Sequence, residues 1–326
     1  MKDTKYTFCL PAYKTRFLAE SLNSIKSQTY TDFVCIVSDD CSPEDVKTIF
    51  DDTVGDDTRF IYRRNEENMG SKSLVAHWNL LVDMCDTDYL VMASDDDIYA
   101  STFMEEVNIL LSKYPDIDMV RARIANINAE GLEINHDKEF GEYVSQLGYI
   151  RNHFSEGLYK CVGNYIFRTK VLIEKGGFVD TPLAWFSDEM TAIMMSENGC
   201  CNTKDILFYF RFSGINISTN NESSDVLKKK TYAVVYAEKW LSTFVDGLKY
   251  ARNKENEDVI FLCHKKCKEW GMRIYYYIFG VDLVTFIKLL PIIAIRGYWS
   301  REGVMSAIKS QIKKNVFFMR SRRSKK

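Results

Sequence analysis

The segment YLVMASDDDIY, residues 89–99, joins a short apolar run to three consecutive carboxylates. An apolar run of this length between polar turn residues is typical of a buried β-strand. Carboxylates at its end need a cation or hydrogen bonds to hold them there. Mg²⁺ and Mn²⁺ prefer oxygen ligands and often share their coordination between one or two carboxylates and substrate phosphates. We therefore interpret Asp95, Asp96 and Asp97 as a candidate metal site, with an acidic turn that caps the next helix as the alternative.

Strand and helix patterns alternate along the first half of the chain. Apolar runs predict strands at residues 6–11, 33–38, 60–63, 89–93 and 119–127. Helical patterns fall at residues 16–27, 73–83 and 102–114. Thr102 and Glu105 have the spacing of a capping box, and Pro43 is placed to open a further helix. The alternation predicts an α/β fold with a mostly parallel sheet.

Polar residues follow three of these strands. They are Tyr13 after the first, Asp39 and Asp40 after the second, and the acidic triplet after the fourth. Because parallel strands end at the same edge of a sheet, we expect these three loops to line a single crevice.

The second half is less regular. Residues 166–175 predict a strand that runs into a helix stopped by Gly176 and Gly177, and residues 178–186 predict a loop. Ser187 is a plausible N-cap for a helix over residues 188–198 that Gly199 closes. A strand follows at residues 205–212, and residues 141–160 give no clear pattern. The polar stretch at 213–224 predicts a boundary between a catalytic domain, residues 1–222, and a helical region, residues 223–326.

Charge is unevenly distributed. The chain of 326 residues has a net charge of −2, yet the tail from Lys309 carries eight Lys or Arg and no acid, which leaves −10 for the rest. An acidic body with a basic tail favours contact with an anionic membrane surface over nucleic-acid binding. An apolar stripe lies beside these basic residues and consists of Val304, Ile308, Ile312 and Val316. It fits a helix that lies in the membrane interface, or else a helix that packs on the catalytic domain or on a second subunit. The oligomeric state is left open.

The compartment is inferred from the start of the chain and from its cysteines. Residues 1–5 show no signal-peptide core, and the nine cysteines lack paired CxxC spacing, so we expect free thiols in the cytoplasm, with the protein peripheral on the inner face of the membrane. Residues 274–299 are apolar but contain no uncharged run near the ~18 residues of a membrane span. Cys263, His264 and Cys267 are interpreted as ordinary helix residues.

From Tyr6 to Ser218, the order of several motifs resembles the family-2 glycosyltransferases, which have the GT-A fold. Leu10-Pro-Ala-Tyr13 looks like the family's opening Pro-x-Tyr, and residues 28–42 are similar to its "QTY…VDDGS" segment. Asn68-x-Gly70 with Asn79 matches "N-x-G…N", and residues 94–98 match the Asp-x-Asp region. Residues 176–178, followed by Asp188 and Gly199, look like "GGF…ED…G".

The resemblance implies a role for each matching residue. Asp188 would be the general base, Asp96 the metal ligand with Asp97 second, and Asp95 a contact to the ribose or a support for the metal. The nucleotide-sugar site would also include Pro11, Tyr13 and Asp40 around the base, together with Asn68, Gly70 and Asn79. The implied activity is inverting, Mn²⁺- or Mg²⁺-dependent transfer of a sugar from a nucleotide-diphosphate donor, here a UDP-sugar, to a hydroxyl of a glycan or lipid-linked acceptor in surface polysaccharide synthesis.

The chain departs from the family pattern at several positions. Ser187 replaces the family's Glu, Cys41 its Gly, and Trp78 its Arg. Where many members have a histidine after a Tyr-x-Arg strand, this chain has Ser213, which leaves Arg211 as a weaker substitute for a contact to metal or diphosphate. A nucleotide-sugar-binding or scaffold protein that has kept the fold and lost catalysis is therefore the alternative function.

Overall fold

The structure is a computed structural model. It describes residues 4–154, 158–214, 216, 223–248 and 254–280, together with residues 285, 288, 289 and 291. The chain divides into two compact units, residues 1–216 and 217–326, which are described separately. The stripe from Val304 to Val316 and the basic tail from Lys309 lie outside the described residues.

In the first unit, the described residues form a mixed sheet in the order β3-β2-β1-β4-β9-β6-β10-β5, with β7 paired to β6 and β8 to β10. β1 is parallel to β2 and β4, β2 is parallel to β3, and β6 is parallel to β10, whereas β9 runs antiparallel to β4 and β6. The predicted α/β class is confirmed. The strands are β1 (Tyr6–Ala12), β2 (Phe33–Asp39), β3 (Phe60–Arg64), β4 (Tyr89–Met92), β5 (Ile98–Tyr99), β6 (Met119–Ile127), β7 (Glu133–His136), β8 (Tyr143–Val144), β9 (Tyr165–Arg168) and β10 (Cys200–Arg211).

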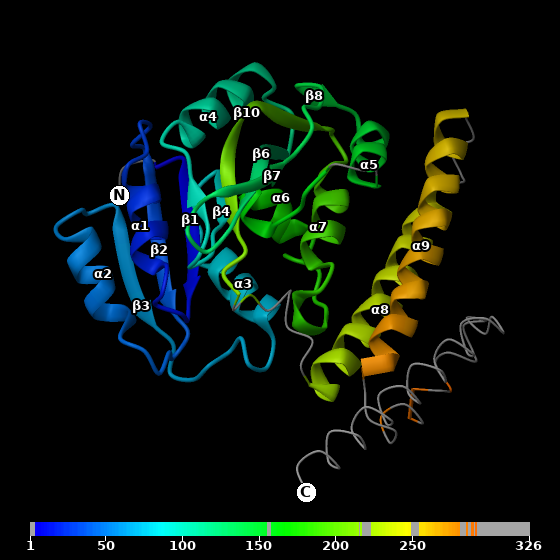
Figure 1. Ribbon diagram of the computed structural model, residues 1–326. Helices are drawn as coiled ribbons and strands as arrows, with labels where there is room; N and C mark the ends of the chain where they lie inside the picture. The colour runs from blue at the N-terminus through cyan, green and yellow to red at the C-terminus, as the bar shows by residue number, and fades with distance from the viewer. Residues whose placement is uncertain are drawn as a thin grey trace, which may run out of the picture. The chain divides into compact units, whose positions relative to one another are not determined.

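Helices cover both faces of this sheet (Figure 1). The alternation of side chains along β1 shows the two faces. The ring of Phe8 lies 6.1 Å from that of Phe103 on α4, whereas Sγ of Cys9 lies 3.3 Å from that of Cys85, just after α3. The helices of this unit are α1 (Leu18–Lys26), α2 (Val46–Val54), α3 (Leu74–Asp83), α4 (Phe103–Lys113), α5 (Gln146–Phe154), α6 (Thr169–Glu174) and α7 (Ser187–Met195), with short 3₁₀ turns at Val162–Asn164 and Pro182–Ala184.

Two predicted helix starts are wrong, and a predicted capping box does not form. α2 begins at Val46 and is capped by Asp45, whose carboxylate accepts from Thr48 N at 3.0 Å, so Pro43 does not open it. Thr102 is the N-cap of α4, but its side chain makes no capping hydrogen bond: Met104 N donates instead to Gln28 Oε1 at 3.0 Å, and Glu105 accepts from Thr29 Oγ1 at 2.9 Å. Ser187 is the first residue of α7 rather than its N-cap. In each case a partner distant in sequence or a different local polar residue satisfies the helix end.

β10 is longer than the sequence predicts. It begins at Cys200, five residues before the expected start at Asp205. The register of its pairing with β6 shifts between Asn202 and Ile206, and the amide of Asn202 donates to Gly141 O at 2.9 Å. This irregularity places consecutive polar residues inside the strand and hides the alternating pattern.

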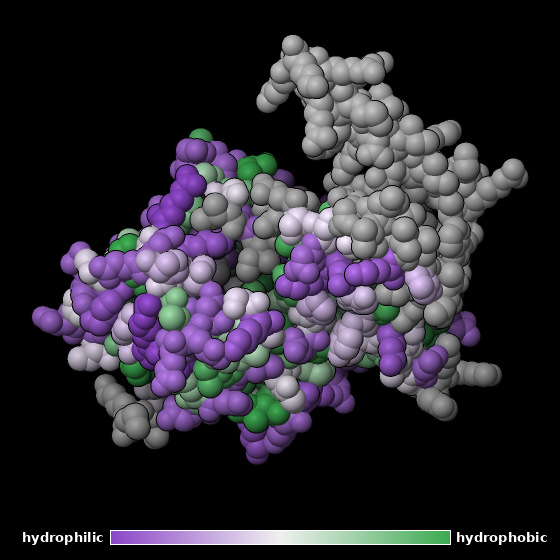
Figure 2. Space-filling view, turned by 90° about the horizontal axis from the view of Figure 1, so that it is seen from below, coloured by the Kyte–Doolittle hydropathy of each residue, from purple (hydrophilic) through white to green (hydrophobic). Residues whose placement is uncertain are grey.

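The second unit contains two long helices, α8 (Ser224–Leu248) and α9 (Lys254–Gly280), which pack side by side (Figure 1). Buried residues of α8 recur every three or four positions, among them Leu227, Val234 and Leu241, as expected for a packed face. No helix within the described part of the chain is long and apolar enough to cross a lipid bilayer. On the face shown in Figure 2, hydrophilic residues cover most of the described surface.

All nine cysteines are free thiols, as predicted. Cys263 and Cys267 lie on α9 with His264 between them. The described residues contain no cluster of three or more His, Cys, Asp or Glu side chains arranged to hold a metal ion on their own. A metal in this part of the chain would therefore need ligands from a substrate as well.

Candidate active site

The acidic triplet follows the carboxyl end of β4, and Asp95 ties it to the loop after β1. Oδ2 of Asp95 accepts from the main-chain N–H of Tyr13 at 2.9 Å and of Lys14 at 2.8 Å. Burial and the neighbouring charge of Asp96 raise the pKa of Asp95 to about 6. No described residue donates a hydrogen bond to its other oxygen, and its contact with a ribose remains a prediction.

The loop after β2 joins the same edge. Ser42 Oγ donates to Tyr13 O at 2.6 Å, and the main-chain N–H of Asp40 donates to Ala12 O at 2.9 Å. The three loops therefore meet at one edge of the sheet, as expected from strand direction, while a crevice between them remains a prediction. Pro11 is half-buried at the end of β1, and the side chain of Tyr13 is 39% exposed, so a planar group can approach its ring.

Asp40 is held by the Asn68–Gly70 turn. Its carboxylate accepts from Met69 N at 2.9 Å, Gly70 N at 2.7 Å and Asn65 Nδ2 at 2.8 Å. A Cβ on Gly70 would lie 2.9 Å from Oδ2 of Asp40, so the close approach requires glycine. Asn68 stabilises the turn by accepting from Ser71 N at 2.8 Å. Nδ1 of the buried His77 also lies 3.7 Å from Oδ2 of Asp40, so a hydrogen bond from this carboxylate to a nucleotide base remains a prediction.

Asp96 and Asp97 are both buried but differ in their partners. Asp97 accepts from Ser94 Oγ at 2.6 Å and from the main-chain N–H of Arg211 at 2.9 Å. Asp96 accepts longer bonds, from Ser94 Oγ at 3.2 Å and from Asn216 Nδ2 at 3.1 Å. The carboxylate of Asp96 is thus the one less committed to the protein.

Arg211, at the end of β10, supports the acidic loop through hydrogen bonds. It is 1% exposed, and its Nε donates to the main-chain oxygen of Asp96 at 3.0 Å. Its guanidinium pairs with Glu20 at 2.6 Å and lies 4.4 Å from the ring centre of Phe17. The guanidinium therefore orients the loop through its backbone, while its charge is matched by Glu20 rather than by the triplet.

The triplet does not form a metal site by itself, but its chemistry suits a divalent cation that a substrate also ligates. Within the described residues, no ion pair reaches the carboxylates of Asp95, Asp96 or Asp97, although all three are adjacent and largely buried. Burial and the charge of Asp96 also raise the pKa of Asp97 to about 8. Such mutual repulsion is what a bound cation relieves. Asp96 would be the direct ligand, and Asp97 would orient the loop.

Asp188 lies at the start of α7. Its Oδ1 accepts from the main-chain N–H of Glu189 at 2.9 Å. Burial, followed by the charge of Glu189, raises the pKa of Asp188 to about 7. The thiol of Cys161 lies 3.6 Å from Oδ2 of Asp97, and its pKa is raised by burial and by the charges of Asp97 and Asp188.

Asn79 anchors the loop that leads to Asp188. Its Oδ1 accepts from Phe178 N at 2.8 Å, and its Nδ2 donates to Phe178 O at 3.2 Å. Both polar atoms of the amide are used in this way, so Asn79 supports the loop, and its contact with a nucleotide sugar remains a prediction. Beyond the anchor, three non-glycine residues adopt positive φ: Leu183, Ala184 and Phe186.

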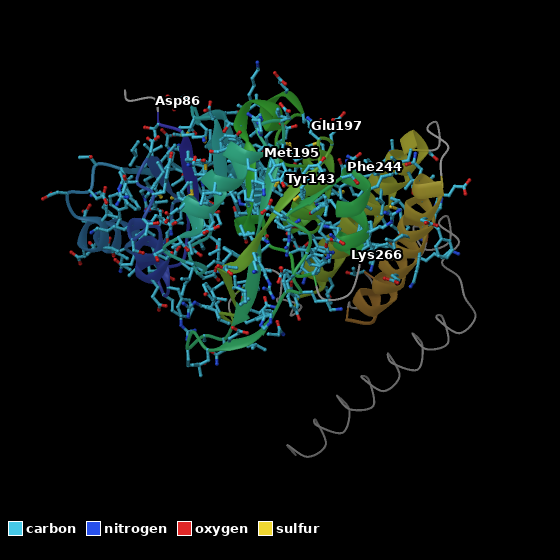
Figure 3. All side chains as sticks on the ribbon, turned by 90° about the horizontal axis from the view of Figure 1, so that it is seen from above. Asp86, Tyr143, Met195, Glu197, Phe244 and Lys266 are labelled. Carbon is cyan, nitrogen blue, oxygen red and sulfur yellow. The ribbon has the colours of Figure 1, made fainter. Side chains whose placement is uncertain are left out.

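α7 ends at Met195 with Ser196 as its C-cap, so the helix is shorter than the predicted range 188–198, and Gly199 lies in the turn between α7 and β10 instead of closing the helix. Gly199 has φ +90°, and a Cβ there would lie 2.7 Å from the ring of Tyr143. The hydroxyl of Tyr143 is 3.5 Å from Asn198 O, and Figure 3 labels this tyrosine together with Met195 at the end of α7. The glycine thus lets β8 approach the turn after the helix.

Several residues of this site were missed from the sequence. They are Ser94, Cys161, Asn216 and Glu20, and they meet Asp96, Asp97 or Arg211 through contacts that span up to 191 residues. Only Ser94, adjacent to the triplet, carried a local signal. The others become neighbours only when the sheet assembles, with β9 beside β4 and β10 on the far side of β6.

Comparisons with known proteins show the family and the fold of this chain. The model of the family described as Glycosyl transferase family 2 matches residues 7–176. S. aureus TarS, residues 1–349, solved with UDP-GlcNAc, is 16% identical with a TM-score of 0.56, over 94% of this chain and 89% of that one. The mannosyltransferase PcManGT from Pyrobaculum calidifontis, solved with GDP-Man and Mn²⁺, is 14% identical with a TM-score of 0.53, over 94% and 80%. At these identities the two structures are similar in fold.

Proposed function

We propose, from the premise that this chain belongs to glycosyl transferase family 2, that it is an inverting, metal-dependent enzyme. It moves a sugar from a nucleotide-diphosphate donor to a hydroxyl of a glycan or lipid-linked acceptor in surface polysaccharide synthesis. The observation that carries this proposal concerns Cys161: its thiol lies 3.6 Å from Oδ2 of Asp97, and its pKa is raised by burial and by the charges of Asp97 and Asp188. We infer that Asp188, as the base, and the acidic loop, as the cation ligand, serve one reaction centre.

The donor side is formed by the three loops at the sheet edge. The exposed ring of Tyr13 and the half-buried Pro11 offer a surface for the base, and the carboxylate of Asp40 can accept an N–H of the base. Asp95 retains one oxygen for the ribose. Mn²⁺ or Mg²⁺ held by Asp96 would neutralise negative charge on the departing diphosphate. Solved structures of similar fold contain UDP-GlcNAc and GDP-Man, and we propose a UDP-sugar here.

The acceptor side rests on Asp188. With a pKa raised to about 7, this carboxylate is largely ionised just above neutral pH and can take the proton of an acceptor hydroxyl. Proton transfer of this kind typically contributes ~10²–10⁴ in rate. With Asp188 as base and no carboxylate assigned as nucleophile, the sugar passes directly to the acceptor, so the anomeric configuration inverts.

The experiment is a UDP-release and GDP-release assay on a panel of nucleotide sugars with Mn²⁺, for the wild type and Asp188→Asn. The proposal expects turnover that falls ~10²–10⁴-fold in Asp188→Asn while nucleotide binding is kept. Metal-dependent binding without turnover, unchanged by the substitution, would instead support the binding or scaffold function. The observation that favours this alternative is Ser187, which is buried and replaces the family's Glu.

Membrane contact is a separate part of the proposal. The eight basic residues from Lys309 onward, set on a chain whose remainder carries −10, favour an anionic bilayer surface near a lipid-linked acceptor. This would hold the enzyme peripherally on the cytoplasmic face of the membrane.

A further inference from the structure

A second carboxylate stands beside Asp188 and is held from two sides. Oε2 of Glu189 lies 3.0 Å from Nε2 of His153 on α5 and 2.9 Å from Nζ of Lys160, which precedes the first 3₁₀ turn. His153 is fully buried, and the side chain of Lys160 is 21% exposed. Three segments of the chain therefore converge on this one side chain.

The protonation of the cluster follows from its hydrogen bonds. Burial and the charge of Lys160 lower the pKa of His153 to about 4, so its ring is neutral at physiological pH and carries one N–H. An ionised Glu189 can only accept, which places the proton on Nε2. Nδ1 then accepts from the hydroxyl of Tyr149 at 3.1 Å, and that hydroxyl bonds to Tyr165 at 3.0 Å.

Glu189 therefore keeps its negative charge. Burial alone would raise its pKa, but Lys160 and His153 together hold it well below the usual range. Asp188, by contrast, forms no ion pair with a described residue and accepts the main-chain N–H of Glu189, while the charge of Lys160 acts on it more weakly than burial and the charge of Glu189 do. Two consecutive carboxylates thus have opposite environments, an arrangement that commonly separates a fixed charge from a proton acceptor.

We propose that Glu189 is a positioning residue. Its negative charge, held by His153 and Lys160, strengthens the affinity of Asp188 for the acceptor proton, whereas the positive charge of Lys160 weakens that affinity. This inference rests on the proposed role of Asp188 as the base. The other titratable groups around the pair are Cys161, Tyr165 and, facing His153, Arg121. The first two are neutral at physiological pH, because burial raises the pKa of both, so Glu189 and Lys160 are the charges next to Asp188.

The test measures the proton affinity of Asp188 without any substrate. Asp188→Asn is introduced into the wild type and into each variant described in the next paragraph. The thermal stability of each protein is then compared with and without Asp188→Asn from about pH 4 to pH 9. Between the ordinary Asp pKa and the raised one, the folded protein binds more protons than the unfolded chain. The stability of the Asp188 protein relative to Asp188→Asn therefore falls as pH rises, and the difference levels off at the folded pKa.

The two neighbouring charges give opposite expectations. In Glu189→Gln, the difference levels off at a pH lower by roughly 0.5–1 unit, because a like charge has been removed. In Lys160→Met, the stability difference levels off at a pH higher by a similar amount, because an opposite charge has been removed. Lys170→Met, an exposed lysine on α6, is the matched control and leaves the levelling pH unchanged.

Opposite shifts support the inference. Shifts in the same direction, or none, overturn it, because a purely structural role would lower stability without moving the levelling pH. If Glu189→Gln does not fold, the sign of the Lys160→Met shift decides alone. Turnover by Asp188→Asn is a separate result: if that variant is still fully active, the catalytic role of Asp188 fails, whatever the electrostatic shifts show.

Discussion

The main-chain N–H of Arg211 donates to Oδ1 of Asp97 at 2.9 Å, across 114 residues of sequence. The last strand of the sheet thereby supports the loop that follows the fourth. Since the same arginine also binds the main-chain oxygen of Asp96, the position of the candidate metal ligand depends on a residue that need not touch the metal. Arg211 therefore connects the stability of the fold to donor binding.

Substitution of Arg211 tests this connection. Arg211→Met leaves buried acceptors unpaired, so we expect the free energy of unfolding to fall by about 2–4 kcal/mol, measured by urea denaturation. Mn²⁺-dependent nucleotide binding should weaken in the variant that remains folded. Lys170→Met, on the exposed face of α6, serves as the control and should change neither quantity. Unchanged metal dependence in a folded Arg211→Met would contradict the connection.

The loop anchored by Asn79 offers a second prediction. In Gly177→Ala, φ of +80° and a Cβ 2.5 Å from Oδ1 of Asn79 should together cost about 1–3 kcal/mol of stability. In an Asn79→Ala background the same substitution should cost less, because the clash is gone. Gly176→Ala, also at positive φ but with open space around its Cβ, should show no such coupling. If the losses in unfolding free energy of the Asn79 and Gly177 substitutions are additive in urea denaturation, the two residues are not in steric contact.

The pH dependence of turnover reports on Asp188. Its pKa is raised to about 7, and a general base must be ionised to act. We expect kcat to rise about tenfold per pH unit below this value and to level off above it, measured by nucleotide release with a donor that gives turnover. In Asp188→Asn, the remaining kcat should no longer rise with pH in this range. A rate that stays constant between about pH 5 and pH 9 would mean that Asp188 does not limit the reaction.

Liposome sedimentation tests the tail. Deletion of residues 309–326 should release the protein from vesicles that contain anionic lipid, and added salt should have the same effect on the full chain, because attraction between exposed charges is screened. Neutral vesicles are the control. Equal sedimentation of the full and shortened chains with anionic vesicles would argue against tail-mediated binding.

The sequence was informative where a segment's own residues determine its structure. The apolar runs of β1 to β4 and β6 were found to within about a residue, because buried parallel strands are continuous apolar stretches. Ser73 caps α3 within its own turn, by accepting from Ala76 N at 3.0 Å. The convergence of the first, second and fourth loops also followed from strand direction alone.

Long-range contacts were not readable in this way. The cluster of His153, Lys160 and Glu189 assembles only when α5 and α7 pack, and residues 141–160 carried no periodic signal. Cys41, which departs from the family's glycine, adopts φ +53°, so the backbone conformation is kept even where the residue is not. The start of β10 was missed because its polar residues are satisfied by a neighbouring loop and a shifted register.

The central claim is that Asp96 holds a divalent cation which binds the donor diphosphate. Isothermal titration of UDP, and of GDP in parallel, with and without Mn²⁺ measures this directly. The account predicts that Mn²⁺ strengthens binding of one of the two nucleotides at least ~10-fold, about 1.4 kcal/mol, in the wild type and in Asp116→Ala, an exposed control, but not in Asp96→Ala. If Asp96→Ala binds both nucleotides as the wild type does, with the same response to Mn²⁺, the metal site is not at Asp96.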